Sequence, residues 1–514
     1  MDTLSNLLFL CLLLPLVVAF VAPLFSPKRA TYLSFLAFIL PFFAIIYSVF
    51  KVAPFEIPLT TFSPPIGEFY LHFDFISYAF GLTICIVSAM IALFALPYMK
   101  HRFEEMGREV ESEFRKYIFL YDLYAASMLW LVFSGNFVLL YVFLEITLIT
   151  AFLLIYTYGY GNRKWVGMLY LIWCAVAGVL TLAGIVLVAF ENDTLALNIL
   201  MAGGKVSTLA WAFIFAGMII ELPVLGPHIW LPWAHAEAPT PVSALLSPLT
   251  VGLAGYVLLR TALIDYSFIE TYRIPILAYA IFSSIYGGFS VFKQTDFKRL
   301  LAYSTVSQMG YILVALCLGP FGLIGLVIQY MSHAFGKSIL FSSAGGIIAV
   351  HHGLRDINKM GGLHDSIPAI SNAAVLGFLN LGGMLTVGML GEFFILRGVV
   401  ETFGVTKSSL GIILAVIFMF ILSVWYGFYT IRKVFYGKPR STKRLEISRY
   451  LYVPLYIIGI VSVLLLFPPL STVLIQGLNL ISGLGLGGLG VGGLGVGGLG
   501  VGGLGVGGVG GVVP

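Results

Sequence analysis

Long apolar runs follow one another through almost the whole chain, and they constrain its fold more than any other feature. Hydrophobic residues make up 60% of the 514 residues and charged residues only 10%, with a mean hydropathy of +1.01. Soluble domains carry roughly a quarter charged residues, so we predict an all-α, polytopic membrane protein. Since about 20 apolar residues span a bilayer, about 14 transmembrane helices are expected. Their predicted positions are near 5–25, 31–50, 71–99, 117–133, 136–158, 165–190, 207–226, 242–262, 274–292, 299–319, 321–350, 371–397, 409–431 and 450–475.

The basic residues support this arrangement of spans. Three quarters of the 28 lysines and arginines fall in the loops that follow odd-numbered spans. Loops rich in lysine and arginine stay on the cytoplasmic side of a membrane, so the N-terminus is predicted to lie outside. The first residues, MDTLSNLLFL, contain no basic segment. We interpret them as the start of the first span and not as a cleaved signal.

Several classes of chemistry are not indicated. The cysteines lie inside apolar runs without a CxxC pair, so we expect neither a metal site nor disulfides. We find no nucleotide-binding glycine loop, no haem or iron–sulfur spacing and no nucleophile–base set, and therefore expect no cofactor. A charge-free Gly/Leu/Val repeat over 482–514 is interpreted as a flexible tail.

Residues 211–260 begin and end as apolar helices, but five prolines interrupt them between 223 and 241. Proline inside a helix removes a hydrogen bond and clashes with the preceding turn. Non-helical backbone at membrane depth persists only where protein buries it or where it lines a watery cavity. The interruption is therefore a candidate ion path. Its histidines would relay protons or, alternatively, cap the backbone, and its ionisable residues are Glu221, His228, His235 and Glu237.

Two carboxylates lie within the predicted spans of the first half of the chain. Ionisable residues inside a membrane are costly and are functional candidates by default. Glu145 lies near the middle of a very apolar span; the alternative is a packing role beside Thr147 or Thr150. Glu221 precedes the first proline of the interruption; the alternative is an interfacial position facing water. Two buried carboxylates close together repel when both ionise, so the pair would hold one exchangeable proton.

The second half contains three further candidates. His333 and Lys337 are four residues apart and share one helix face. A buried lysine can change its charge state; the alternative is a permanent ion pair with a carboxylate. Glu392 follows a glycine-rich segment that predicts a second broken helix near 382–392, as inverted repeats would produce. The alternative is an interfacial glutamate near Arg397. Three charged residues near span ends are interpreted as interfacial or ion-paired: Asp74, Asp122 and Arg260.

Four motifs occur in order: GPHIWLPWAHAEAPTPVSALLSP, DFKRLLAYSTVSQMGYILVAL, YMSHAFGKSILFSSAGGII and GMLGEFFILRG. Together they resemble the antiporter-like subunits of respiratory complex I, membrane-bound hydrogenase-type complexes and Mrp Na⁺/H⁺ antiporters. The resemblance, over roughly 70–435, implies two inverted five-helix repeats, each with a broken helix. The expected parts are an N-terminal segment 1–100, a first repeat 117–262, a second repeat 274–431 and a last helix 450–475.

The resemblance implies that a row of protonatable residues follows the membrane midplane, coupled to redox chemistry in neighbouring subunits. Glu145 matches the carboxylate of the fifth span, and Glu392 matches the ionisable position of the second broken helix. His333 and Lys337 match the His…Lys pair of the second half. The chain departs from the family in its first half, where a lysine usually stands at the position of Glu221.

Two other positions also depart from the family pattern. Many members have a basic residue on the span after the first broken helix, where this chain has Ser247 and Gly252. The motif WLPDAH has become WLPWAH, with Trp233 in place of the aspartate. The first half has thus lost its usual positive centre. Either the pair of Glu145 and Glu221 carries protons by a different mechanism, or this half does not transport protons.

The expected function is ion translocation, of H⁺ or Na⁺, by a non-catalytic membrane subunit of an energy-converting redox complex. The complex would be complex I-like, a hydrogenase or a related reductase. Its expected partners are other membrane subunits, Mrp-like antiporter subunits, a redox arm and the lipid bilayer, without nucleic acid. One alternative is a structural subunit that bridges redox and antiporter modules without moving ions. Another is a subunit of a stand-alone Mrp-type Na⁺/H⁺ antiporter.

Overall fold

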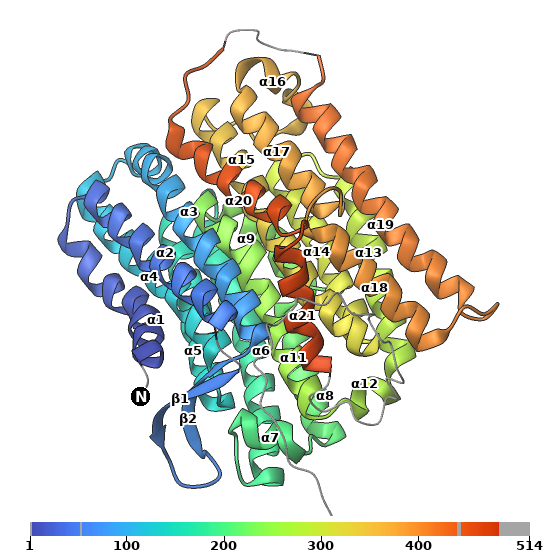
Figure 1. Cartoon of the computed structure of the whole chain (residues 1–514). Coiled ribbons are helices and arrows are strands. Elements are labelled where there is room, and N and C mark those ends of the chain that lie inside the picture. Colours follow the sequence, from blue (N-terminus) through green and yellow to red (C-terminus); the bar gives the residue numbers. More distant parts are fainter. Residues whose placement is uncertain (1–2, 52–53, 439–443, 483–514) are drawn as a thin grey trace, which may run out of the picture.

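The computed structural model describes residues 3–51, 54–438 and 444–482, which form a bundle of helices (Figure 1). The tail predicted to be flexible lies outside the described residues except for Ser482, the last residue of α21. The N-terminal side of the bundle consists of α1 (Thr3–Val21), α2 (Pro27–Lys51), α3 (Phe75–Glu105), α4 (Val110–Phe133), α5 (Phe137–Tyr158) and α6 (Arg163–Asn192).

The remaining helices include several short pieces. They are α7 (Leu197–Gly203), α8 (Thr208–Glu221), α9 (Trp230–Glu237), α10 (Thr240–Leu245), α11 (Val251–Ile264), α12 (Ser267–Thr271), α13 (Arg273–Phe292), α14 (Phe297–Leu316), α15 (Gly319–Val350), α16 (Leu363–Ser366), α17 (Pro368–Leu381), α18 (Val387–Phe403), α19 (Leu410–Thr430), α20 (Val453–Leu464) and α21 (Leu470–Ser482). Two π-helical turns, Leu246–Thr250 and Ile431–Phe435, join α10 to α11 and lengthen α19.

Ten helices of the described chain are long and apolar enough to cross a membrane, so the predicted number of 14 is not confirmed. Three of the missing spans are divided into helices shorter than 18 residues: α8, α17 with α18, and α20 with α21. The fourth, α14, is long enough, but serine, threonine and glutamine side chains interrupt its apolar run. The missing spans are therefore those that are broken or unusually polar.

A two-stranded antiparallel hairpin, β1 (Phe55–Thr61) and β2 (Glu68–Phe73), lies at one end of the bundle beside α7 (Figure 1). The all-α prediction did not include it, and the span predicted over 71–99 begins too early. The side chain of Asp74 accepts a hydrogen bond from the backbone N–H of Ser77 at 2.8 Å. This N-cap ends the strand and starts α3.

The helix α15 lies at the centre of the bundle and contacts α3, α10, α14, α17, α18 and α20. Every residue from 322 to 348 is buried. A helix that is buried on all sides faces protein and not lipid, so its polar residues lie inside the protein. Two interruptions flank this centre: the chain leaves helical structure after α8 ends at Glu221, and again between α17 and α18 over 382–386.

Candidate functional site

The structure brings the two carboxylates of the first half together against α6. The carboxylate of Glu145 lies against Gly178, where an added Cβ would be 2.2 Å from its Oε1. Glu221, the last residue of α8, faces Cys174, one turn earlier on the same face of α6. Each glutamate has a buried Oε1 without a hydrogen-bond partner. The two lie within electrostatic reach of each other.

Lys337 lies in the middle of α15 and is fully buried. Its Nζ donates to the carbonyl oxygen of Leu301, at 2.6 Å, and to the hydroxyl of Ser304, at 2.5 Å. Among the described residues, no carboxylate lies within ion-pair distance of this nitrogen. The alternative of a permanent ion pair is therefore wrong. Two neutral oxygens hold the amine, so its charge is not fixed by a partner.

His333 lies one turn before Lys337 on the same helix and is also fully buried. Its Nε2 is 3.3 Å from the carbonyl oxygen of Ser247, while its Nδ1 has no partner. The hydroxyl of Ser247 pairs with that of Thr305 at 2.7 Å. The polar face of α15 therefore contacts the first half of the chain at Ser247.

His235, in the first interruption, lies in the same region as His333 and Lys337. The residue is fully buried in α9, its ring is 4.7 Å from that of Phe341, and neither ring nitrogen has a partner. It lies within electrostatic reach of Lys298, Lys337 and His333. Buried polar atoms normally have hydrogen-bond partners, often ordered water. Both ring nitrogens of His235 are therefore free to bind a proton or an ordered water between α9 and α15.

Sequence reasoning missed Lys298, which was counted as a loop residue. Its side chain is buried, and its Nζ donates to the carbonyl oxygen of Ala238, at 2.5 Å, between α9 and α10. The signal that could have found it is helical spacing. Lys298 precedes the inward-facing Thr305 by two turns of α14, so both point to the interior.

His228 occupies a different place. Its Nδ1 accepts a hydrogen bond from the backbone N–H of Gly226 at 3.1 Å, and its ring faces Tyr286 and Tyr303. This matches the alternative in which the histidine caps the interrupted backbone.

Trp233 is 39% exposed, with the guanidinium of Arg299 stacked 4.4 Å from its ring.

Amide and hydroxyl side chains of α14, α15 and α19 lie between Lys337 and the second interruption. Ser304 is followed one turn later by Gln308, whose Nε2 donates to the hydroxyl of Tyr426 at 3.2 Å. Gln329 donates to Gln308 Oε1 at 2.7 Å. Tyr426 lies within electrostatic reach of Glu392. Hydrogen bonds therefore join Gln329, Gln308 and Tyr426 near Glu392, and Ser304, which binds Lys337, lies one helical turn before Gln308.

Glu392 lies in the second turn of α18, with its carboxylate against Gly383 in the 382–386 interruption. Its Oε1 is buried without a hydrogen-bond partner. The structure thus places this glutamate at the break, whereas Arg397, its expected alternative partner, is in ion-pair distance of Glu401.

The space beside Gly252 is occupied by a side chain from another helix. An added Cβ would be 2.4 Å from the ring of Tyr330, which stacks on Phe80 at 3.9 Å between centroids. A basic side chain at this position would displace two aromatic rings. Position 252 therefore carries no basic residue and has no free space for one.

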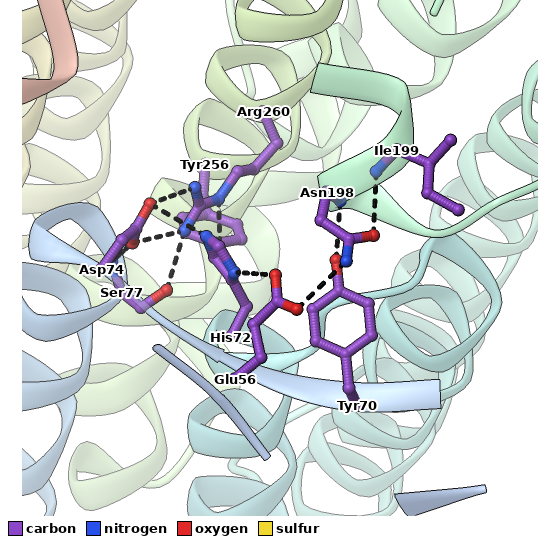
Figure 2. Close-up of polar contacts among 9 residues, drawn as sticks. All are labelled: Glu56, Tyr70, His72, Asp74, Ser77, Asn198, Ile199, Tyr256 and Arg260. Atoms are coloured by element: carbon purple, nitrogen blue, oxygen red, sulfur yellow. Dashed lines mark hydrogen bonds and ion pairs between the residues drawn. The ribbon is translucent and has the colours of Figure 1, made fainter. Parts of the chain in front are cut away.

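A charged cluster joins the hairpin to α3 and α11 (Figure 2). The buried Arg260 pairs with Asp74, as expected of charges near span ends. His72 lies 3.4 Å from carboxylate oxygens of both Glu56 and Asp74. Burial opposes its charged form, but the two carboxylates outweigh burial and raise the pKa of His72. Burial likewise opposes the charge of Asp74, yet Arg260 and His72 hold its pKa well below the ordinary value.

Asp122 does not belong to a span end, and that prediction is wrong. It lies halfway along α4 and is fully buried. Its Oδ2 accepts a hydrogen bond from the hydroxyl of Ser34 on α2 at 2.7 Å, while Oδ1 has no partner. The residue therefore fixes α4 against α2, away from the axis that contains Lys337.

Comparisons with known proteins agree with this architecture. Over 61% of its length, the chain is 30% identical to NAD(P)H-quinone oxidoreductase chain 4 3 of Trichormus variabilis, covering 60% of that protein. It is 28% identical to Na⁺/H⁺ antiporter subunit A1 of Staphylococcus haemolyticus, over 91% of the chain and 62% of that protein. The chain thus spans about 60% of the length of these relatives.

The fold is similar to a chain of the membrane-bound sulfane sulfur reductase, an archaeal respiratory membrane complex. The TM-score is 0.79 at 22% identity, covering 92% of this chain and 97% of that chain. A family model described as NADH:quinone oxidoreductase/Mrp antiporter, TM, matches residues 134–442, which is more than half of the sequence. This multi-pass membrane protein belongs to the NADH:quinone oxidoreductase/Mrp antiporter transmembrane family.

Proposed function

We propose that the chain is an antiporter-like, ion-translocating subunit of a multisubunit energy-converting membrane complex. It moves protons along buried lysine, histidine and glutamate side chains and performs no redox chemistry itself. Its partners are other membrane subunits, including Mrp-like antiporter subunits, and a redox arm.

The observation that carries the proposal is the environment of Lys337. An amine fully buried in a central helix, held by two neutral oxygens, keeps no fixed counter-charge. Such an amine gains or loses a proton when the charge of its surroundings changes. His333, one turn before Lys337 on α15, and His235 both lie within electrostatic reach of that amine.

The second half offers a route away from Lys337. Ser304, Gln308, Gln329 and Tyr426 form a row of hydrogen-bonding groups that ends near Glu392. Polar and ionisable groups inside a membrane are costly and are therefore functional candidates. We assign Glu392 as the proton acceptor at the far end of this row.

The repeats and the orientation form part of the same proposal. Segments 117–262 and 274–431 are two inverted repeats, with α8/α9 and α17/α18 as their broken helices. The N-terminus faces outside, so that the lysine- and arginine-rich loops face the cytoplasm. The interruptions after Glu221 and before Val387, each beside a glutamate whose Oε1 is buried without a hydrogen-bond partner, support this pairing.

A second candidate, a structural subunit that moves no ions, is favoured by the first half alone. Glu145 and Glu221 have no cation within ion-pair distance among the described residues. In the ion-translocating assignment, the glutamates hold one proton between them and shift the charge state of the second half.

Proton and sodium uptake by the purified complex in liposomes separates the two candidates. With assembly intact, Lys337→Ala and Glu392→Gln each abolish coupled uptake if the second half conducts, and Glu221→Lys changes its rate. If none of the three substitutions affects uptake in assembled complex, the structural assignment replaces the proposal.

A further inference from the structure

A surface pocket of about 610 Å³ lies between the start of α6 and the end of α9. The helix α3 starts beside the hairpin and runs for 31 residues, so its last turn lies at the opposite end of the bundle (Figure 1). In that turn, Arg102 donates hydrogen bonds to the carbonyl oxygens of Tyr158 and Gly159, which places the α5–α6 loop at the same end. The pocket is lined by Gly161, Asn162, Trp165, Val166, Trp233 and Glu237. The proposed function uses none of these side chains.

Two tryptophans form walls of this pocket. The ring of Trp165, on α6, lies 5.5 Å from that of Trp233, on α9, and the rings are nearly perpendicular. Both side chains are exposed. Tryptophan gathers where a membrane meets water, at the level of the lipid headgroups. The face of an indole also attracts a cation, as the guanidinium of Arg299 on Trp233 illustrates. The pocket therefore lies at headgroup depth and has walls that suit a cation.

Glu237 gives the pocket a negative charge. Its carboxylate packs against Gly161, where an added Cβ would be 2.7 Å from Oε2. The backbone carbonyl oxygen of Glu237 accepts a hydrogen bond from the N–H of Tyr160 at 2.7 Å, which holds the end of α9 against the α5–α6 loop. Among the described residues, no cation lies within ion-pair distance of this carboxylate. The carboxylate is therefore held in place and remains available for a ligand.

Two cations accompany the indole rings. Arg299 stacks on Trp233, and the exposed Lys164 directly precedes Trp165. In the part of the chain that the structure describes, neither cation has a carboxylate within ion-pair distance. A simple anion would meet the carboxylate of Glu237, and a simple cation would leave both basic side chains unpaired. A group with one positive and one negative charge complements the whole set.

An exposed apolar stripe on α6 continues from the pocket toward the other end of the bundle. Residues three or four apart share one face of a helix. After Trp165, the exposed apolar side chains at this spacing are Met168, Ile172, Val176 and Val179. With a rise of 1.5 Å per residue, the stripe is about 21 Å long. A hydrocarbon chain that starts at the pocket therefore finds apolar side chains along its length.

We propose that this pocket binds a zwitterionic phospholipid whose headgroup carries an ammonium. The ammonium pairs with Glu237 beside the indole rings, the phosphate faces Arg299 and Lys164, and one acyl chain follows the stripe of α6. Trp233, which stands where the family motif has an aspartate, is thus part of a lipid site. The inference goes beyond the proposed function and does not depend on ion transport.

Photo-crosslinking in the purified complex tests the preference for an ammonium headgroup. The vesicles consist of phosphatidylglycerol with a trace of phosphatidylethanolamine or phosphatidylglycerol that carries a diazirine in one acyl chain. Crosslinked peptides are compared between the α6 stripe and a similarly exposed stripe of α19: Leu414, Ile421 and Trp425. The ratio of α6 to α19 crosslinks should be about tenfold higher for the ethanolamine probe, because only its ammonium pairs with the carboxylate. Equal ratios for the two probes would overturn the inference without any variant.

Two substitutions locate the site. In assembled complex, Glu237→Gln and Trp233→Leu should each lower the ethanolamine ratio to that of phosphatidylglycerol. The matched control is Glu104→Gln, at an exposed position near the end of α3, which should keep the native ratio. An unchanged preference in Glu237→Gln would contradict the pairing of the ammonium with this carboxylate.

The same experiment distinguishes a lipid from a protein at this surface. If neither probe labels α6 while both label α19, a partner subunit covers the pocket and the inference is wrong. Because the measurement reports lipid and not transport, each of these outcomes leaves the proposed function as it stands.

Discussion

The guanidinium of Arg260 donates two hydrogen bonds to the carboxylate of Asp74, at 2.6 and 2.8 Å, although the residues are 186 positions apart. Arg260 is fully buried, and Asp74 also caps the N-terminus of α3. The pair therefore joins α11 to the start of α3, and His72 extends it to the hairpin (Figure 2).

Asp74→Asn should lower the free energy of unfolding by about 3–5 kcal/mol, because it leaves a buried arginine without its counter-charge. Asparagine still caps a helix, so the loss reports the ion pair. Thermal unfolding of the purified protein in detergent measures it. The control is Glu111→Gln, which removes an exposed ion pair with Arg115 and should cost less than about 1 kcal/mol. Equal effects of the two substitutions would contradict this prediction.

The contacts of His72 with the hairpin and Asp74 should stabilise the folded protein more at acidic pH. The pKa of His72 is raised in the folded protein, so its protonated form favours folding. This contribution is fully present below the unfolded pKa of about 6.5 and is lost as pH rises through the folded pKa. The destabilisation caused by His72→Gln should therefore shrink as pH rises over this range. The control is His364→Gln, whose ring stacks on Tyr436; a pH-independent effect of His72→Gln would refute the prediction.

Gly178→Ala should impair transport without removing any ionisable group. The added methyl would lie 2.2 Å from Glu145 Oε1, so the carboxylate must move. If Glu145 acts in transport, the displacement lowers coupled proton uptake by about ten- to a hundredfold. Gly203→Ala is the matched control, because an added Cβ there meets nothing within 4 Å. Native uptake by Gly178→Ala would remove Glu145 from the path.

Lys298→Met should lower coupled proton uptake by about tenfold or more, because methionine keeps an unbranched apolar side chain but removes the amine near His235. Lys293→Met, at an exposed position before the same helix, should leave uptake unchanged. The assembled fraction and the thermal midpoint must be measured alongside uptake. If the assembled fraction and the thermal midpoint both fall while uptake per assembled complex stays normal, Lys298 only fixes the interruption at Ala238.

The sequence by itself determined the properties that depend on neighbouring residues. Apolar runs identified the membrane class, and the prolines after Glu221 located an interruption, because hydropathy and proline act over a few residues. Buried ionisable residues stood out for the same reason. Glu145 and Lys337 are conspicuous in their own segments whatever surrounds them.

Only the tertiary structure decided which of these residues meet. The ion pair of Asp74 with Arg260 and the aromatic filling above Gly252 join segments far apart in the sequence. In the sequence, Lys298 is next to a loop, but α14 places its side chain inside the bundle. The hairpin was missed because two short strands next to a long apolar run give a weak local signal. Such contacts depend on how whole helices pack, which no local pattern encodes.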